Sequence, residues 1–264
     1  MCLIVFAHQL LPDLPLVLSA NRDEFYTRPT AEADFWREDH PQILAGRDLI
    51  ANGTWLGITA QGRFAAVTNI RDPSQPELRP RSRGDLTREF LASDMSPAHW
   101  CQDLRSRFAD FAGFNLLVSD GREMFYANNL LDRIEALEPG LYGLSNGELN
   151  SDWPKVNLAR ERLQKLMAEP DKLTTDALLK LLSDRQRAAD SELPRTGVAL
   201  ELERKLSSAF IHNPERLYGT RCSTALMLAA DGRHRFSERN FNEQAQAQSC
   251  HFFQLPMPAS ATSQ

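Results

Sequence analysis

The stretch that decides the fold is Met1-Cys2-Leu3-Ile4-Val5-Phe6-Ala7-His8, at the start of the 264-residue chain. Its run of Ile, Val and Phe predicts a buried strand. The two prolines of Leu11-Pro12-Asp13-Leu14-Pro15 then predict a turn, and Leu16 to Ala20 a second strand that forms a hairpin with the first. We therefore expect the polar run Asn21-Arg22-Asp23-Glu24 to follow the second strand, close to where the first strand begins.

Cys2 is the candidate nucleophile of this arrangement. An initiator Met is generally removed when the next residue is small, which would leave a thiol and a free α-amine on Cys2. An α-amine has a pKa of about 7.7–8.0, so it can accept the thiol proton near neutral pH. The alternative is that Cys2 is one more buried apolar residue of the strand.

The polar run supplies the first candidate partners of Cys2. We expect Asp23 to hold the α-ammonium of Cys2, and Asn21 and Arg22 to bind anionic charge or substrate. A salt-bridged strand end is the alternative reading of the same residues.

Three further polar residues follow predicted strands elsewhere in the chain. Asn69 and Asn146 are candidate oxyanion donors, because an amide NH₂ can point at a developing negative charge. Arg221 is a candidate ligand for a carboxylate or oxyanion. Each could instead be an ordinary turn residue or a surface salt bridge. Trp153, just after the Asn146 loop, is predicted to form a pocket wall, whereas we assign Trp55 and Trp100 to the core.

Hairpins dominate the remaining strand predictions, so the sheets should be mostly antiparallel. We predict hairpins over 55–59 with 63–69, 114–119 with 123–128 and 223–229 with 233–239, a last strand over 250–255, and helices over 84–92, 97–108, 154–168, 175–183 and 199–206. This order predicts an α+β fold in which two antiparallel sheets lie between helix layers, a four-layer αββα sandwich. We expect one domain over residues 1–255 and a frayed tail over 256–264.

Composition excludes several classes of protein. The chain is 42% hydrophobic and 25% charged with a net charge of −5, which suits a globular domain and not a nucleic-acid binder. The stretch Arg79-Pro80-Arg81-Ser82-Arg83 is interpreted as a solvated loop. Four cysteines without a Cys-x-x-Cys pair predict reduced thiols, no metal site and a cytoplasmic location. No apolar run is long enough to span a membrane.

Together these motifs resemble the NRDE-motif family, that of the transport and Golgi organisation protein 2 homologues. The matching residues are Met1-Cys2, Asn21-Arg22-Asp23-Glu24, Gly53-Thr54-Trp55-Leu56-Gly57, Thr68-Asn69, Leu144-Ser145-Asn146 and Tyr218-Gly219-Thr220-Arg221. More distantly, the chain is similar to the cysteine N-terminal-nucleophile (Ntn) hydrolases, such as bile salt hydrolase and penicillin V acylase.

That resemblance implies an Ntn-hydrolase-like sandwich and a set of site roles. It makes Cys2 the nucleophile, Asp23 its contact, Asn69 and Asn146 the oxyanion donors, and Arg221 the late active-site Arg. One position departs from the acylases, which carry an Arg where this chain has Ala20. Arg22 could replace that Arg only from what we expect to be the opposite face of the strand.

The favoured function is therefore an N-terminal cysteine hydrolase that acts on a non-peptide amide bond of a small molecule. The alternative is a non-enzymatic carrier of haem or another hydrophobic ligand, since the family is linked to haem trafficking and lipid metabolism. The six histidines are candidate haem ligands, but none lies in a Cys-x-x-Cys-His motif. A third hypothesis is a trafficking scaffold with a relic site. The sequence does not name a substrate or an oligomeric state, and it indicates no cofactor apart from haem as a ligand.

Overall fold

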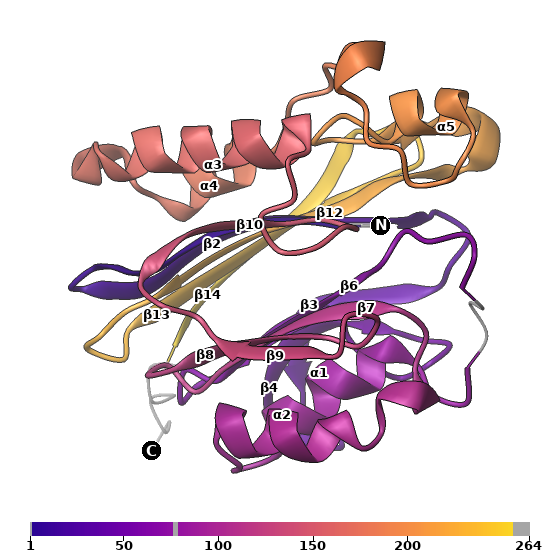
Figure 1. Cartoon of the computed structure of the whole chain (residues 1–264). Helices are drawn as coiled ribbons and strands as arrows, with labels where there is room; N and C mark the ends of the chain where they lie inside the picture. Colours follow the sequence, from indigo (N-terminus) through magenta and orange to yellow (C-terminus); the bar gives the residue numbers. More distant parts are fainter. Residues whose placement is uncertain (1, 76–78, 256–264) are drawn as a thin grey trace.

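The computed structural model describes residues 2–75 and 79–255, and it consists of two antiparallel sheets with helices on their outer faces. Helices α3, α4 and α5 cover one sheet and α1 and α2 cover the other, so the layers follow the order αββα (Figure 1). The predicted fold class is thereby confirmed. The predicted frayed tail, 256–264, lies outside the described residues.

The first sheet contains both ends of the described chain. Its order is β10 (Gly140–Leu144), β1 (Cys2–Leu11), β2 (Leu14–Phe25), β12 (Tyr218–Leu228), β13 (His234–Phe241) and β14 (Ala247–Leu255), with β11 (His212–Asn213) beside β12. The second sheet follows chain order through β3 (Thr30–Trp36), β4 (His40–Asp48), β5 (Leu56–Thr59), β6 (Phe64–Asn69), β7 (Phe114–Ser119), β8 (Met124–Asn128) and β9 (Arg133–Ala136).

The helices agree with their predicted positions to within about three residues at each end. They are α1 (Arg83–Ala92), α2 (Pro97–Arg105), α3 (Pro154–Met167), α4 (Thr175–Leu181) and α5 (Leu200–Lys205). Ser82 and Ser96 cap α1 and α2 by accepting hydrogen bonds from backbone N–H groups of the first turn. None of the helices in the described residues is long and apolar enough to cross a membrane.

Strand β1 is apolar over residues 2–7 because both of its faces are buried there. Ile4 and Phe6 pack between the two sheets, whereas Leu3 and Val5 pack under the α3–α4 layer. A separate cluster fills the space between the second sheet and helices α1 and α2. The first sheet is therefore the middle of two cores, and any polar side chain on it must find a partner on one face or the other.

Two features of the fold differ from the sequence prediction. Strand β2 continues to Phe25, so Asn21-Arg22-Asp23-Glu24 lies inside the strand rather than after it. Strands β3, β4, β9 and β11 were not predicted, and no range was predicted for β10. Strand β3 is an edge strand with several exposed positions, so its sequence lacks a buried apolar run.

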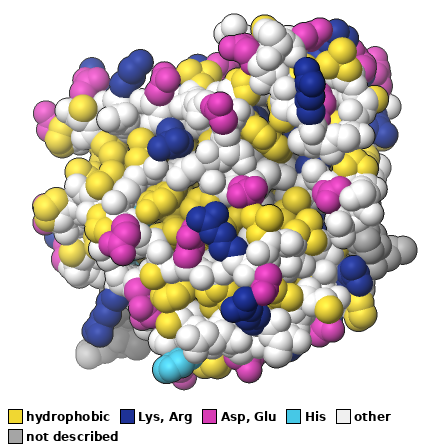
Figure 2. Space-filling view, in the orientation of Figure 1, with side chains coloured by type: hydrophobic (Ala, Val, Ile, Leu, Met, Phe, Trp, Pro, Cys, Tyr) yellow, Lys and Arg dark blue, Asp and Glu magenta, His cyan; other side chains and the backbone are white. Residues whose placement is uncertain are grey.

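On the face shown in Figure 2, basic and acidic side chains are interspersed and apolar side chains show between them.

Candidate functional site

Cys2 is the first residue of β1 and lies at the floor of a cleft. It pairs directly with Arg22 of β2, and both residues belong to the face that looks into the space between the sheets. Only 8% of Cys2 is exposed, and its carbonyl accepts a 2.8 Å hydrogen bond from Ser145 Oγ. The cleft has a volume of about 700 Å³ and is lined by residues of both sheets and of the α1 N-terminus, Cys2 and Arg22 among them.

Asp23 is buried beside Cys2 in the neighbouring strand. Its Oδ1 accepts a 2.7 Å hydrogen bond from Thr220 Oγ1, and its carbonyl accepts one from the Tyr218 hydroxyl at 3.1 Å. Burial raises the pKa of Asp23, although the ammonium of Lys155 opposes that shift. Burial also raises the pKa of the Cys2 thiol; the Asp23 carboxylate adds to this rise, and Arg22 opposes it. The structure therefore brings the predicted nucleophile and its predicted carboxylate partner together.

Asn69 and Asn146 come from different segments and meet at the edge of the cleft. Asn69 ends β6 and lines the cleft, and its backbone carbonyl accepts a 2.8 Å hydrogen bond from Asn146 Nδ2. Asn146 is buried, with its own carbonyl bonded to the backbone N–H of Arg71 at 2.7 Å. Of the two predicted oxyanion donors, Asn69 lines the cleft and Asn146 lies behind it.

Asn21 does not face the cleft, which corrects its predicted role in substrate binding. It pairs with Leu3 and therefore points toward the helix layer, on the opposite face from Cys2. Its amide nitrogen donates to the carbonyls of Leu182 and Ala209, both at 2.9 Å, and its Oδ1 accepts from Ser223 Oγ at 2.7 Å. With every polar atom engaged in a fully buried site, Asn21 joins the sheet to the helix layer.

Arg22 does face the cleft, and it shares this face with Ala20. The expectation that these two residues lie on opposite faces was wrong, because residues two apart in a strand point the same way. The ion-pair partner of Arg22 is Glu24, at 3.6 Å between Nη2 and Oε2. Arg22 is thus the cationic side chain directly across from Cys2.

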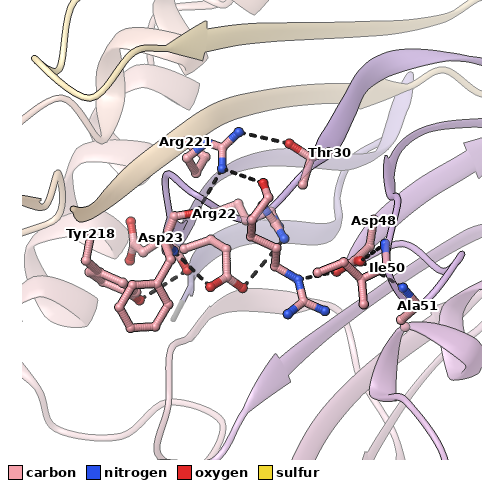
Figure 3. A network of polar contacts seen from close by, with 12 residues as sticks. Arg22, Asp23, Thr30, Asp48, Ile50, Ala51, Tyr218 and Arg221 are labelled. Carbon is pink, nitrogen blue, oxygen red and sulfur yellow. Dashed lines mark hydrogen bonds and ion pairs between the residues drawn. The ribbon is translucent and has the colours of Figure 1, made fainter. Parts of the chain in front are cut away.

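Arg221 holds the turn that follows β2. Its guanidinium donates to the carbonyls of Phe25 and Arg28 at 2.9 and 3.0 Å, and to Thr30 Oγ1 at 3.0 Å (Figure 3). The side chain lines the cleft, but these bonds use its donors to fix the segment from β2 to β3. Its geometry is that of a residue that shapes the cleft wall.

Trp153 does not line the described cleft, which corrects the prediction of a pocket wall. Its ring lies under the guanidinium of Arg71, at 4.9 Å, beside the helix-layer core. Arg71 in turn forms a buried 2.5 Å ion pair with Glu203. Trp55, which we assigned to the core, does line the cleft while also packing against both adjoining cores.

Lys155 is a charged residue near the site that the sequence analysis missed. It is 5% exposed in the first turn of α3, and its Nζ donates to the carbonyl of Leu206 at 3.0 Å. Burial, aided by repulsion from Arg71, lowers the pKa of Lys155 to about 8, and attraction to Asp23 and Cys2 opposes this shift. One signal was present in the sequence: a Lys in the first turn of a helix is disfavoured by the helix dipole.

Sequence comparison assigns the chain to a family. The family model described as Transport and Golgi organisation 2 matches residues 1–243. The chain belongs to the Transport and Golgi organisation 2 family. It is 33% identical over 260 residues to the Transport and Golgi organization protein 2 homolog of Bos taurus, covering 91% of this chain and 93% of that one. The corresponding human homolog is 32% identical with the same coverage.

Solved structures share the fold of this family member at much lower sequence identity. The Caenorhabditis elegans ortholog of N-acylethanolamine-hydrolyzing acid amidase superposes with a TM-score of 0.51 at 12% identity, covering 85% of this chain and 92% of that chain. The C2A mutant of conjugated bile acid hydrolase from Clostridium perfringens superposes with a TM-score of 0.56 at 9% identity, covering 96% and 92%. These likenesses establish an Ntn-hydrolase fold for the chain.

The histidines of this Transport and Golgi organisation 2 family member lie away from the described cleft lining. His8 and His234 are buried, and burial lowers the pKa of both. His251 is paired with Glu32 at 2.5 Å. Among the described residues, no group of three or more His, Cys, Asp or Glu side chains is placed to hold a metal ion.

Proposed function

We propose that this chain is an N-terminal-nucleophile amidohydrolase that cleaves a non-peptide C–N amide bond of a small molecule, with Cys2 as the nucleophile. One observation carries the proposal: Cys2 begins a strand at the floor of a cleft, with buried Asp23 and cleft-facing Arg22 beside it. The two structural neighbours act on amides by their names, an N-acylethanolamine and a conjugated bile acid. They support the reaction class and leave the substrate open.

The reaction begins with removal of Met1, which places the α-amine on the same residue as the thiol. The amine takes the thiol proton as Sγ attacks the amide carbonyl carbon, and it returns that proton to the leaving nitrogen as the C–N bond breaks. Water then attacks the thioester, releases the carboxylic acid and restores the thiol.

The other predicted site residues have separate roles in this proposal. Asp23 holds the α-ammonium, and Asn69 donates to the oxyanion of the tetrahedral intermediate. Asn146 positions Asn69 through the 2.8 Å bond to its carbonyl, and Arg221 fixes the cleft wall. The alternative function, a carrier of haem or another hydrophobic ligand, has less support because charged side chains make up much of the cleft lining.

The test combines the mass of the purified chain with the loss of one thiol. We expect the mass to lack Met1, and an N-acyl amide library to yield free acid at a rate that Cys2→Ala lowers by about 10³-fold or more. Cys250→Ala is the matched control, since Cys250 is exposed on the edge strand β14 and should leave the rate unchanged. Retention of Met1, or full activity of Cys2→Ala, would overturn the proposal. Saturable haemin binding by an inactive chain would favour the carrier function.

A further inference from the structure

The Arg22 guanidinium is a nearly buried cation that faces the cleft with little compensation. Its side chain is 12% exposed, yet its ion-pair partner, the Glu24 carboxylate, lies 3.6 Å away, beyond normal hydrogen-bond length. The other carboxylate oxygen of Glu24 accepts a 2.8 Å bond from the backbone N–H of Phe25. None of the Arg22 nitrogens is among the buried side-chain atoms that lack a partner, so the guanidinium is open to the water of the cleft, and an anionic ligand can replace that water.

The other carboxylates that line the cleft are already engaged, Asp23 among them with Thr220 Oγ1 at 2.7 Å. Asp48 binds Arg28 at 2.6 Å and accepts two backbone N–H groups, and Glu32 is paired with His251. Glu238 is 2% exposed and accepts the backbone N–H of Ala33 at 2.8 Å. These contacts hold the carboxylates in place, so they are not available to pair with Arg22.

The cleft as a whole has an excess of basic side chains. Among the residues that the structure describes, seven arginines line it against five carboxylates, although the chain has a net charge of −5. Part of the excess comes from Arg79, Arg81 and Arg83, the stretch interpreted from sequence as a solvated loop. An anionic ligand would therefore be attracted to the cleft mouth before it reaches Arg22.

We propose that Arg22 binds a carboxylate of the substrate, and that the substrate class is N-acyl amino acids. This inference rests on the proposed amide hydrolysis at Cys2. Cys2 and Arg22 are directly opposed residues, so their Cβ atoms lie about 4.5–5.5 Å apart. Both side chains leave neighbouring strands on the same face, so a carboxylate held by Arg22 can lie close to the scissile bond, and the carboxylate of an N-acyl amino acid is one carbon from the amide nitrogen. The planar fork of Arg matches such a group with two parallel hydrogen bonds.

The competing role for Arg22 is stabilisation of the oxyanion during attack. The two roles differ in their dependence on substrate charge. An oxyanion forms on every amide, so that role would affect charged and neutral substrates equally. A carboxylate-binding role affects only the substrate that carries the carboxylate, chiefly through KM.

The experiment compares an N-acylglycine with the N-acylglycinamide of the same acyl chain, using the full-length, Met1-processed protein. We expect kcat/KM to be about 10- to 100-fold higher for the N-acylglycine, and Arg22→Gln to remove this preference mainly by raising KM. Arg22→Lys should keep part of the preference. Arg216→Gln, which removes an exposed cation outside the cleft lining, is the matched control and should retain it. A wild-type preference for the neutral amide, or equal losses on both substrates in Arg22→Gln, would overturn the inference.

A binding measurement separates this inference from the proposed hydrolysis. If neither compound is cleaved, calorimetry with Cys2→Ala should still show tighter binding of the N-acylglycine, and adding Arg22→Gln should abolish the difference. That result would retain the carboxylate site and reject the hydrolase. Equal binding of the two compounds would reject the carboxylate site.

Discussion

The two faces of strand β2 perform different tasks within one short motif. Ala20 and Arg22 point into the space between the sheets, where Arg22 meets Cys2 and the cleft. Ser19 and Asn21 point the other way and donate to carbonyls of the helix layer, Ser19 to Leu178 at 2.7 Å and Asn21 to Leu182. Neighbouring residues of β2 therefore face the cleft and the helix layer in turn.

This difference teaches that a conspicuous polar motif need not act as one unit. Because side chains alternate across a strand, a four-residue polar run in a doubly buried strand must satisfy two environments. Asn21 holds the helix layer against the sheet through the carbonyls of Leu182 and Ala209, whereas Asp23 accepts hydrogen bonds from Tyr218 and Thr220 of the neighbouring strand β12. Arg22, on the other face, borders the cleft and pairs with Glu24.

The largest effect is expected from Asn21→Ala, which tests whether the helix-facing side of β2 contributes more to stability than the cleft-facing side. The change removes three hydrogen bonds in a fully buried site and leaves the carbonyls of Leu182 and Ala209 without that donor. We expect the free energy of unfolding to fall by about 3–5 kcal/mol in urea titrations. Arg22→Gln is the matched change on the other face and should cost less than about 1 kcal/mol. Equal losses for the two variants would show that the faces do not differ.

The fold was predictable from sequence where a segment has one strong periodicity. The β1–β2 hairpin, the paired strands around it and all five helices follow from apolar runs, turn residues and caps. The edge strand β3 was missed because exposed positions interrupt its apolar pattern. The end of β2 was misplaced because Asn21 and Asp23 look like loop residues until the helix layer that receives them is known.

The candidate site was predictable only in part for the same reason. Cys2 and Asp23 were placed together because the hairpin fixes their proximity. Asn21 and Trp153 were assigned to the cleft although they belong to the helix side, since a local pattern does not reveal which face is covered. Lys155 was missed because its partners come from distant segments, among them the carbonyl of Leu206.

A smaller effect is expected on the pH dependence of the free energy of unfolding, to which Lys155 on the helix-facing side should contribute. The unfolded chain keeps a proton on this amine up to its ordinary pKa of 10.5, whereas in the folded chain burial lowers the pKa to about 8. Between these values the unfolded state binds more protons at this amine, so the contribution of Lys155 to the stability of the wild type rises with pH. We expect that rise to approach about 3 kcal/mol at its full extent, and to be absent from Lys155→Met.

Urea midpoints at pH 7 and pH 10 measure the difference between wild type and variant. Lys165→Met is the control, because Lys165 is exposed on the same helix and should follow the wild type. If Lys155→Met gains stability with pH as the wild type does, the amine is not held in a destabilised charged state. The helix side of β2 would then destabilise a buried charged amine less than its burial indicates.

The smallest effect is expected from substitutions of two tryptophans, one on the cleft side and one on the helix side of the first sheet. Trp55 lines the cleft, whereas Trp153 lies under Arg71 on the helix side. We expect Trp55→Phe to raise KM for the hydrolysed amide a fewfold, because the smaller ring contacts less of the ligand. Trp153→Phe keeps an aromatic face for Arg71 and should leave KM unchanged. Steady-state kinetics with both variants measure the two KM values. A KM change confined to Trp153→Phe would place the substrate on the helix side of the sheet. The substrate would then bind in a different cleft from the one that Cys2 and Arg22 face.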